Sequence, residues 1–272
     1  MEWVRNMVAN RLADDGASWA AYFSQENSGT YNNAFLVLDY LRVKAAVAER
    51  MPLADGTLTV VEQMPGIIVV TDATKHLQPG GEGYYASYNR IQTPWLFELT
   101  NQTALVAEYG PHFSYANYSR GVIMRERHGG VTNETSFRAL LRYIDWQRDA
   151  TGGQGCTAPA RSGSNGISER GDLTPDGGGC TCPGTARLDE GGIDAKMTNL
   201  YLMTSGGPPV SIVQAGPTTY NGQPPFVWST SPFAHVPHVG QPDKHDFMWA
   251  AIAPDYPPTA PLSGLVGKLL EA

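Results

Sequence analysis

The spacing of apolar residues along the chain predicts three helices. Residues 134–148 carry the clearest pattern, because Phe137, Leu140, Leu141 and Ile144 fall on one stripe of a helix. The other two are residues 2–13, with Trp3, Val4, Met7, Val8 and Leu12 on one face, and residues 102–109, with Gly110 as the C-cap.

Short apolar runs between turn-forming residues predict strands. In residues 57–72, Pro65 and Gly66 separate two such runs, which indicates a pair of strands joined by a turn. Other strands are expected at residues 34–41, 83–89 and 191–204. Because strands and helices do not alternate regularly, the pattern favours an α+β fold over a doubly wound sheet.

The stretch YYASYNRI, Tyr84 to Ile91, leaves two interpretations open. Aromatic and small residues alternate as in a strand, and the pattern then stops at Asn89 and Arg90. Asn89 is either an ordinary turn residue, since asparagine tolerates the left-handed backbone region, or an amide held at a strand end to meet a substrate.

Two segments differ in composition from the rest of the chain. Residues 151–184 are rich in Gly, Ser, Pro and Thr, and predict a long loop insertion with a poorly ordered middle. Residues 255–272 form a Pro-rich tail. The remaining body extends over residues 1–254.

The overall composition narrows the function classes. Hydrophobic residues make up 42% of the 272 residues and charged residues 17%, which is typical of a chain with a sizeable core. A net charge of −7 argues against a nucleic-acid partner. The longest apolar runs, GIIVV and MWAAIA, are too short for a transmembrane segment. The first 15 residues, with acids and Arg between their apolar runs, do not form a signal peptide.

Three N-glycosylation sequons fall within one short window, at Asn101, Asn117 and Asn133. Sequons matter only in the secretory pathway, so they point away from the cytosol. Chance alone would place about one or two in a chain of this size. We treat all three as glycosylation candidates.

The cysteines Cys156, Cys180 and Cys182 all lie in the Gly-rich segment. Three are too few for a disulfide framework, and the odd number leaves one unpaired. We predict one bridge from Cys156 to either of the other two. The Cys-Thr-Cys pair does not predict a zinc site, because the sequence has no second pair of ligands at a suitable spacing.

No self-contained catalytic set is evident in the sequence. The segment RSGSNG does not have the spacing of a Gly-x-Ser-x-Gly elbow, and LVGK lacks the upstream Gly of a phosphate loop. His235, His238 and His245 lie in a Pro- and Gly-containing segment without the rigid presentation of a metal site. We therefore predict no metal and no cofactor, and expect these imidazoles to cap backbone groups.

A series of long motifs resembles the phospholipase B-like (lamina ancestor) family. The motifs occur in the family's order and extend from about residue 3 to residue 248. They are WVRNMVANRLA, NSGTYNNAFLVLDY, VVEQMPGIIVVTD, YYASYN, GISERGDL, GGIDAKMT, GPTTYNGQPPFVWSTSPF and HVGQPD.

This resemblance implies an N-terminal-nucleophile (Ntn) hydrolase, with an αββα sandwich of antiparallel sheets. In such enzymes a precursor is cleaved so that a Cys becomes a new N-terminus and attacks an acyl ester or amide carbonyl, with its own α-amino group as the base. Members of the family are typically glycosylated and lysosomal or secreted. Their nucleophile and signal peptide precede the WVRN motif, so we expect residues 1–254 to be the C-terminal portion of the domain, incomplete at its N-terminus.

The resemblance also assigns two site residues. The family's oxyanion-binding Asn falls in the SYN motif, at Asn89, and its Arg, which organises the nucleophile, falls in FSYANYSRG, at Arg120. Preorganised donors of this kind typically contribute about 3 kcal/mol to transition-state stabilisation. Arg90 replaces the family's usual aliphatic residue and adds a positive charge near the pocket.

Two functions are therefore expected from the sequence. The first is hydrolysis of acyl ester or amide bonds in lipid-like substrates, with an upstream N-terminal fragment supplying the Cys nucleophile. The alternative is a truncated or degenerate non-catalytic glycoprotein that binds lipid or protein.

Overall fold

The computed structural model describes residues 1–177, 179–189, 194–204 and 210–253, and the predicted tail at 255–272 lies outside them. Helices and small antiparallel sheets are mixed along the chain, so the α+β prediction is confirmed. None of the described helices is long and apolar enough to cross a membrane. The helices are α1 (Glu2–Leu12), α2 (Gly16–Ser24), α3 (Tyr40–Glu49), α4 (Pro94–Leu99), α5 (Gln102–Tyr109), α6 (Ser119–Arg127), α7 (Glu134–Leu141) and α8 (Leu200–Thr204). The strands are β1 (Ala34–Leu38), β2 (Leu58–Met64), β3 (Ile67–Asp72), β4 (Asp194–Met197), β5 (Ser211–Ala215), β6 (Phe226–Val227), β7 (Lys244–His245) and β8 (Ala250–Ile252).

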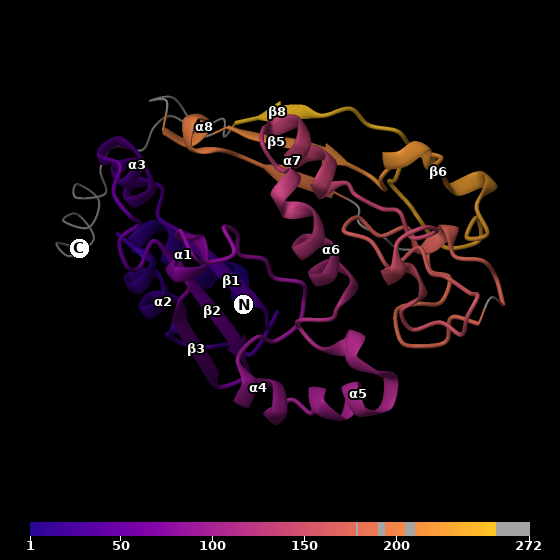
Figure 1. Cartoon of the computed structure of the whole chain (residues 1–272), viewed down its shortest axis with the longest axis horizontal. Helices are drawn as coiled ribbons and strands as arrows, with labels where there is room; N and C mark the ends of the chain where they lie inside the picture. The colour runs from indigo at the N-terminus through magenta and orange to yellow at the C-terminus, as the bar shows by residue number, and fades with distance from the viewer. Residues whose placement is uncertain (178, 190–193, 205–209, 254–272) are drawn as a thin grey trace.

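The first sheet has the order β1-β2-β3 with antiparallel neighbours. Its second hairpin turns at Pro65 and Gly66, and the φ of Gly66 is +72°, in the left-handed region that favours glycine. The predicted pair of strands joined at this turn is confirmed. Figure 1 shows this sheet beside α1 and α2, away from the second sheet.

Helix α2 forms most of the apolar core on the first sheet. The Trp19 and Phe23 rings stack with centroids 4.7 Å apart and pack with Val61 of β2. Helix and sheet approach closely at Gly16, where a Cβ atom would lie 2.2 Å from Oγ1 of Thr59. This close contact explains why the sequence has glycine at the start of α2.

The predicted helix at residues 2–13 is confirmed as α1, but its apolar face does not contribute much to the core. Only Ala9 of this helix is buried. The other apolar residues are exposed to solvent: Trp3, Val4, Met7, Val8 and Leu12. Helical periodicity identifies a face, but it does not decide whether the molecule covers that face.

The strand predicted at 34–41 ends earlier, at Leu38, because Asp39 starts a helix. Its Oδ1 accepts hydrogen bonds from the backbone N–H groups of Leu41 (2.9 Å) and Arg42 (3.0 Å). Asp39 is thus the N-cap of α3, a role that aspartate fills well.

The prediction of a strand at residues 83–89 is wrong, because this segment pairs with none of the strands in the described part of the chain. Its aromatic side chains pack against helix α6 and nearby loops instead. Tyr88 is buried, and a Cβ on Gly121 of α6 would lie 3.2 Å from its ring. The Tyr115 hydroxyl donates to the carbonyl of Ala86 at 2.5 Å, a contact that replaces a sheet partner.

The helix predicted at 102–109 is confirmed, with Gly110 as the C-cap. The helix predicted at 134–148 begins as expected but ends at Leu141. Beyond it, the Arg142 carbonyl accepts from Oγ1 of Thr218 (2.7 Å), and the Tyr143 carbonyl accepts from the N–H of Ile167 (3.0 Å). In a longer helix these two carbonyls would accept hydrogen bonds from N–H groups of the helix itself. Here they accept from distant segments instead, and the helix ends.

The second sheet has the order β4-β5-β8, and helix α7 packs next to β4. The strand predicted at 191–204 is a strand only over β4 and then becomes helix α8, while residues 191–193 lie outside the described part. The short strands β6 and β7 pair with each other as a separate antiparallel sheet. The layered αββα arrangement of an Ntn hydrolase stays a prediction.

The Gly-rich segment is not the loosely ordered loop that its composition predicts. Many of its described residues are buried, among them Arg170, which is 1% exposed. Arg170 pairs with both oxygens of Asp172 at 2.8 Å and donates to the carbonyls of Thr218 (2.6 Å) and Pro224 (2.8 Å). A buried polar network holds this segment where apolar residues are scarce.

Candidate functional site

Asn89 lies at a sharp turn after the segment that packs on α6. Its φ is +59°, in the left-handed region, and its side chain is exposed. The turn-residue interpretation and the site-residue interpretation are therefore compatible, because a left-handed turn is what presents this side chain.

Arg120 is the second residue of α6, and its guanidinium links three segments of the chain. Nη1 donates to Oδ1 of Asn89 at 3.2 Å, and Nη2 donates to Oε1 of Glu169. Asn89 and Arg120, which the sequence analysis singled out, thus lie in direct contact. Glu169 lies in the GISERGDL motif, but nothing in the sequence alone indicated that it would reach Arg120.

The contact with Arg120 fixes which way the Asn89 amide faces. Because Oδ1 accepts from the guanidinium, Nδ2 is turned away from Arg120. Within the described part of the chain, Nδ2 donates no hydrogen bond. The site therefore holds an oriented amide donor with both N–H groups available.

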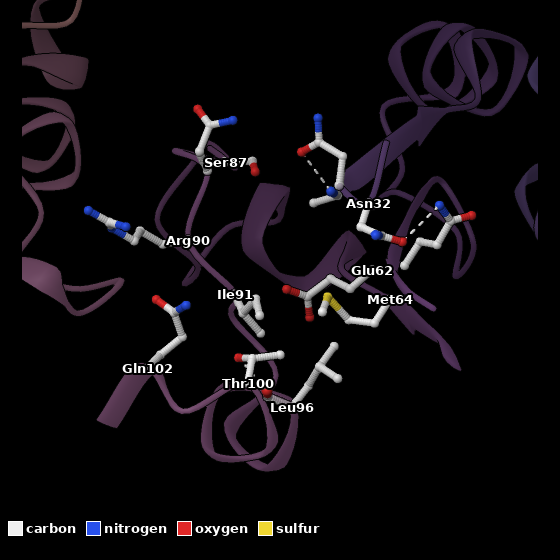
Figure 2. Close-up of a pocket in the computed structure, with 13 residues that line it drawn as sticks. Asn32, Glu62, Met64, Ser87, Arg90, Ile91, Leu96, Thr100 and Gln102 are labelled. Carbon is white, nitrogen blue, oxygen red and sulfur yellow. Dashed lines mark hydrogen bonds between the residues drawn. The ribbon is translucent and has the colours of Figure 1, made fainter. Parts of the chain in front are cut away.

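Asn89 borders a cavity of about 330 Å³ between the first sheet and the loop before α4. Figure 2 shows Asn32 and Glu62 on one side of this cavity, Ser87 and Arg90 on the other, and Leu96, Thr100 and Gln102 along its base. Asn32 donates to the Gly29 carbonyl at 3.0 Å and also lines the cavity.

Glu62 of β2 is a buried carboxylate that fixes the loop beneath Asn89. It accepts hydrogen bonds from the backbone N–H of Gln92 (2.7 Å) and of Thr93 (3.0 Å), and from the Thr93 hydroxyl. None of the motifs in the sequence singled out this residue. Its only sequence signal is that it is the one charged residue of its strand.

Arg90 lies across aromatic rings rather than against an acid. Its guanidinium carbon is 4.6 Å from the Tyr118 ring centroid and 5.0 Å from that of Phe113. Burial lowers the pKa of Arg90, and burial together with Arg90 lowers the pKa of His112. The extra positive charge expected at this position lies beside the cavity and is shielded by the rings.

The structure joins Cys156 to Cys180 in a disulfide and leaves Cys182 free. None of these three cysteines is among the described residues that line the cavity, nor is a His or a Lys. The described lining therefore offers an amide donor and a carboxylate, without a paired thiol nucleophile and base.

In the HVPHVGQPDKHD segment, His238 and His245 pack against aromatic rings, whereas His235 is exposed. The His238 ring stacks on Trp228 with centroids 4.4 Å apart, and its Nδ1 lies 2.6 Å from the Val236 carbonyl. His245 packs against Phe226. Within the described ranges, no group of three or more His, Cys, Asp or Glu side chains gathers as a metal site would require.

The three sequon asparagines all lie on the surface of the described structure. Asn101 has a φ of +58°, and Asn133 is the N-cap of α7. Asn117 precedes Arg120 by three residues and donates to the Ser114 hydroxyl at 3.2 Å. Their glycosylation stays a prediction.

The fold and the cavity define a mixed α+β protein with an oriented amide donor beside a polar pocket. Comparison with known families goes further: the Phospholipase B family model matches residues 1–252, and the chain belongs to this family. The family resemblance expected from the motifs is confirmed.

Individual relatives agree with this assignment. The chain is 40% identical over 247 residues to the Homo sapiens protein named "Putative phospholipase B-like 2", covering 91% of this chain and 40% of that protein. It is 34% identical over 253 residues to "Phospholipase B-like protein B" of Dictyostelium discoideum, covering 92% of this chain and 40% of that protein. The chain therefore spans about two fifths of the length of the relatives it matches.

Proposed function

We propose that this chain forms part of a hydrolase that cleaves acyl ester or amide bonds in lipid-like substrates. The family membership supports a phospholipase B-like activity. In this proposal the nucleophile is an N-terminal Cys on a segment outside these residues, and its α-amino group is the base. Asn89 supplies the oxyanion donor, and Arg120 positions Asn89 and organises the charge around the nucleophile.

The observation that carries the proposal is the hydrogen bond from Arg120 to Asn89, 31 residues away in sequence. A guanidinium that donates to an amide oxygen withdraws electron density from the amide and makes its N–H groups better donors. The same bond holds the amide in place before any substrate binds. Fixed donors of this kind are typically worth about 3 kcal/mol at the transition state.

The proposed reaction has two displacement steps. The thiolate attacks the carbonyl carbon, a C–S bond forms, and the carbonyl electron pair moves to the oxygen, where Asn89 Nδ2 donates. Collapse of this intermediate breaks the C–O or C–N bond, and the leaving group takes a proton from the α-ammonium. In the second step the α-amino group takes a proton from a water molecule as the water oxygen attacks the thioester carbonyl. Collapse of this intermediate breaks the C–S bond and releases the carboxylic acid, which restores the thiolate and the α-ammonium.

The test is expression of this chain together with the coding segment upstream of Met1. We expect the pair to hydrolyse a fatty-acyl ester or amide and to form a thioester, which hydroxylamine releases. The absence of both turnover and thioester in a folded pair would contradict the proposal.

A second candidate is a non-catalytic glycoprotein that binds lipid or protein. It is favoured by one observation: no cysteine of this chain lines the described cavity. Lipid binding by a folded pair without turnover would support this second function instead. Under either function, the sequons at Asn101, Asn117 and Asn133 lead us to propose a lysosomal or secreted location.

A further inference from the structure

A second cavity, of about 380 Å³, lies beside helix α7 and strand β5. Its described lining includes Arg138 and Arg142 from the end of α7, the hydroxyl residues Thr135, Thr219 and Tyr220, and Trp249. It shares no lining residue with the cavity at Asn89. No part of the proposed hydrolytic mechanism uses it.

Arg142 is a buried cation without a partner in this cavity. The residue is 5% exposed, and its Nη1 is buried with no acceptor. None of the described carboxylates or carbonyls accepts a hydrogen bond from its guanidinium. Its backbone, by contrast, is firmly held, because Thr218 Oγ1 donates to its carbonyl at 2.7 Å.

The neighbouring charges do not neutralise Arg142. Burial and the positive charge of Arg170 lower the pKa of Arg142 to about 10, so it stays protonated at neutral pH. Asp194 acts in the opposite direction, but its carboxylate already pairs with Lys196. A buried charge without a counter-charge is strongly unfavourable in a folded protein.

A second arginine, Arg138, lines the same cavity and has an N–H without an acceptor among the described residues. Arg138 pairs with Glu134 through Nη2, while its Nε is buried and has no acceptor. Its guanidinium carbon lies 5.1 Å from the Trp249 ring centroid, which limits its movement. Guanidinium groups bind carboxylate and phosphate oxygens in a defined geometry.

We propose that this cavity binds a phosphate group, held by Arg142 and Arg138 with help from the surrounding hydroxyls. Two guanidinium groups and three hydroxyl residues offer more donors than the two oxygens of a carboxylate need, and they suit a tetrahedral oxyanion. The phosphate belongs either to a soluble phosphate compound or to a lipid headgroup. The site is independent of the proposed hydrolytic reaction.

The test has two binding arms at constant ionic strength. In the first, inorganic phosphate is titrated into the protein by calorimetry, with acetate as the control anion. In the second, vesicles of phosphatidylcholine with and without phosphatidic acid are sedimented with the protein. Saturable binding in the first arm alone assigns a soluble ligand, and binding to phosphatidic acid vesicles alone assigns a headgroup. Binding in neither arm overturns the proposal.

Variants connect the binding to the two arginines. Arg142→Met and Arg138→Gln should each weaken binding about tenfold or more, because each removes a charged donor. The matched control is Arg148→Gln, which removes an exposed arginine paired with Asp145 and should leave binding unchanged.

Melting temperatures distinguish a ligand-binding role of Arg142 from a purely structural one. In phosphate-free buffer, Arg142→Met should melt at the same temperature as the wild type or higher, because it removes an uncompensated buried charge. At a fixed phosphate concentration, the melting temperature should rise more for the wild type and Arg148→Gln than for Arg142→Met or Arg138→Gln. Unchanged phosphate affinity in both variants would overturn the proposal, and Arg138→Gln keeps the test valid if Arg142→Met does not fold.

Discussion

At the scale of single residues, the site depends on one arginine that holds two partners. Arg120 reaches Asn89 with Nη1 and Glu169 with Nη2, so the acid fixes the direction of the guanidinium and the guanidinium fixes the amide. The family motifs pointed to Asn89 and Arg120 as separate site residues. Glu169 could not be predicted from the sequence, because its role depends on a contact across 49 residues.

Glu169→Gln tests this positioning role. Without the negative charge, Arg120 should lose its orientation, and we expect the turnover of the assembled hydrolase to fall about tenfold at unchanged KM. Steady-state kinetics of the co-expressed pair measure this effect. Glu134→Gln, which breaks the salt bridge to Arg138, is the control, and equal losses in the two variants would refute a specific role for Glu169.

At the scale of elements, local patterns succeeded where local contacts decide the structure. The hairpin at Pro65 and Gly66 and the helix ending at Gly110 both follow from turn and cap chemistry. Residues 83–89 and the end of α7 were not predictable in this way. There, side chains and carbonyls bind segments far away in sequence, as the contact between Arg142 and Thr218 illustrates.

The N-cap of α7 provides a test that separates glycosylation from helix stability. Asn133 Oδ1 accepts from the N–H of Ser136 at 2.9 Å, while Nδ2 is the atom that a glycan would modify. Asn133→Asp should remove any glycan and keep the cap, whereas Asn133→Ala should also lower the free energy of unfolding by about 1 kcal/mol. Urea denaturation and the electrophoretic mobility of protein from a eukaryotic host measure the two effects. Equal stability of the two variants would contradict the capping role.

Asp72 at the end of β3 makes the first sheet sensitive to acid. Burial acts to raise the pKa of Asp72, but hydrogen bonds from Thr74 and from the N–H of Gly56 outweigh it, so the pKa is lowered. A lowered pKa gives stability that is present above the unfolded-state value near 4 and is lost as the pH falls through the folded-state value.

We therefore expect Asp72→Asn to be less stable than the wild type at pH 7 and equally stable at about pH 2. Urea midpoints measured across this range provide the comparison, with the exposed Asp55→Asn as the control. A difference between Asp72→Asn and the wild type that does not change with pH would show that the carboxylate's charge is not involved.

At the scale of the whole molecule, amino-acid composition predicted the structure less well than the order of elements did. The middle of the Gly-rich segment was predicted to be poorly ordered, yet its Arg170 is buried and donates to the carbonyls of Thr218 and Pro224. The Cys156–Cys180 bridge links two parts of the segment. Polar networks of this kind have no periodic signature in sequence. The mixed α+β class, in contrast, followed from the order of elements alone.

Reduction of the bridge should destabilise the molecule measurably. The bridge closes a loop between cysteines 24 residues apart. Constraining such a loop in the unfolded chain is worth about 3 kcal/mol. We expect the double variant Cys156→Ser, Cys180→Ser to lose about this much in urea denaturation, while Cys182→Ser stays close to the wild type. A larger loss of stability in Cys182→Ser than in the double variant would contradict the pairing of Cys156 with Cys180.

The central claim is that Asn89 donates to the oxyanion of a hydrolase, and Asn89→Asp tests it most directly. The aspartate keeps the shape and can still accept from Arg120, but it has no N–H to donate. In single-turnover measurements on the co-expressed pair, we predict that thioester formation slows about 10²–10³-fold, with Asn101→Asp, another exposed left-handed asparagine, as the control. A rate for Asn89→Asp within about threefold of the wild type would contradict the claim, since it would leave the amide donor without a catalytic contribution.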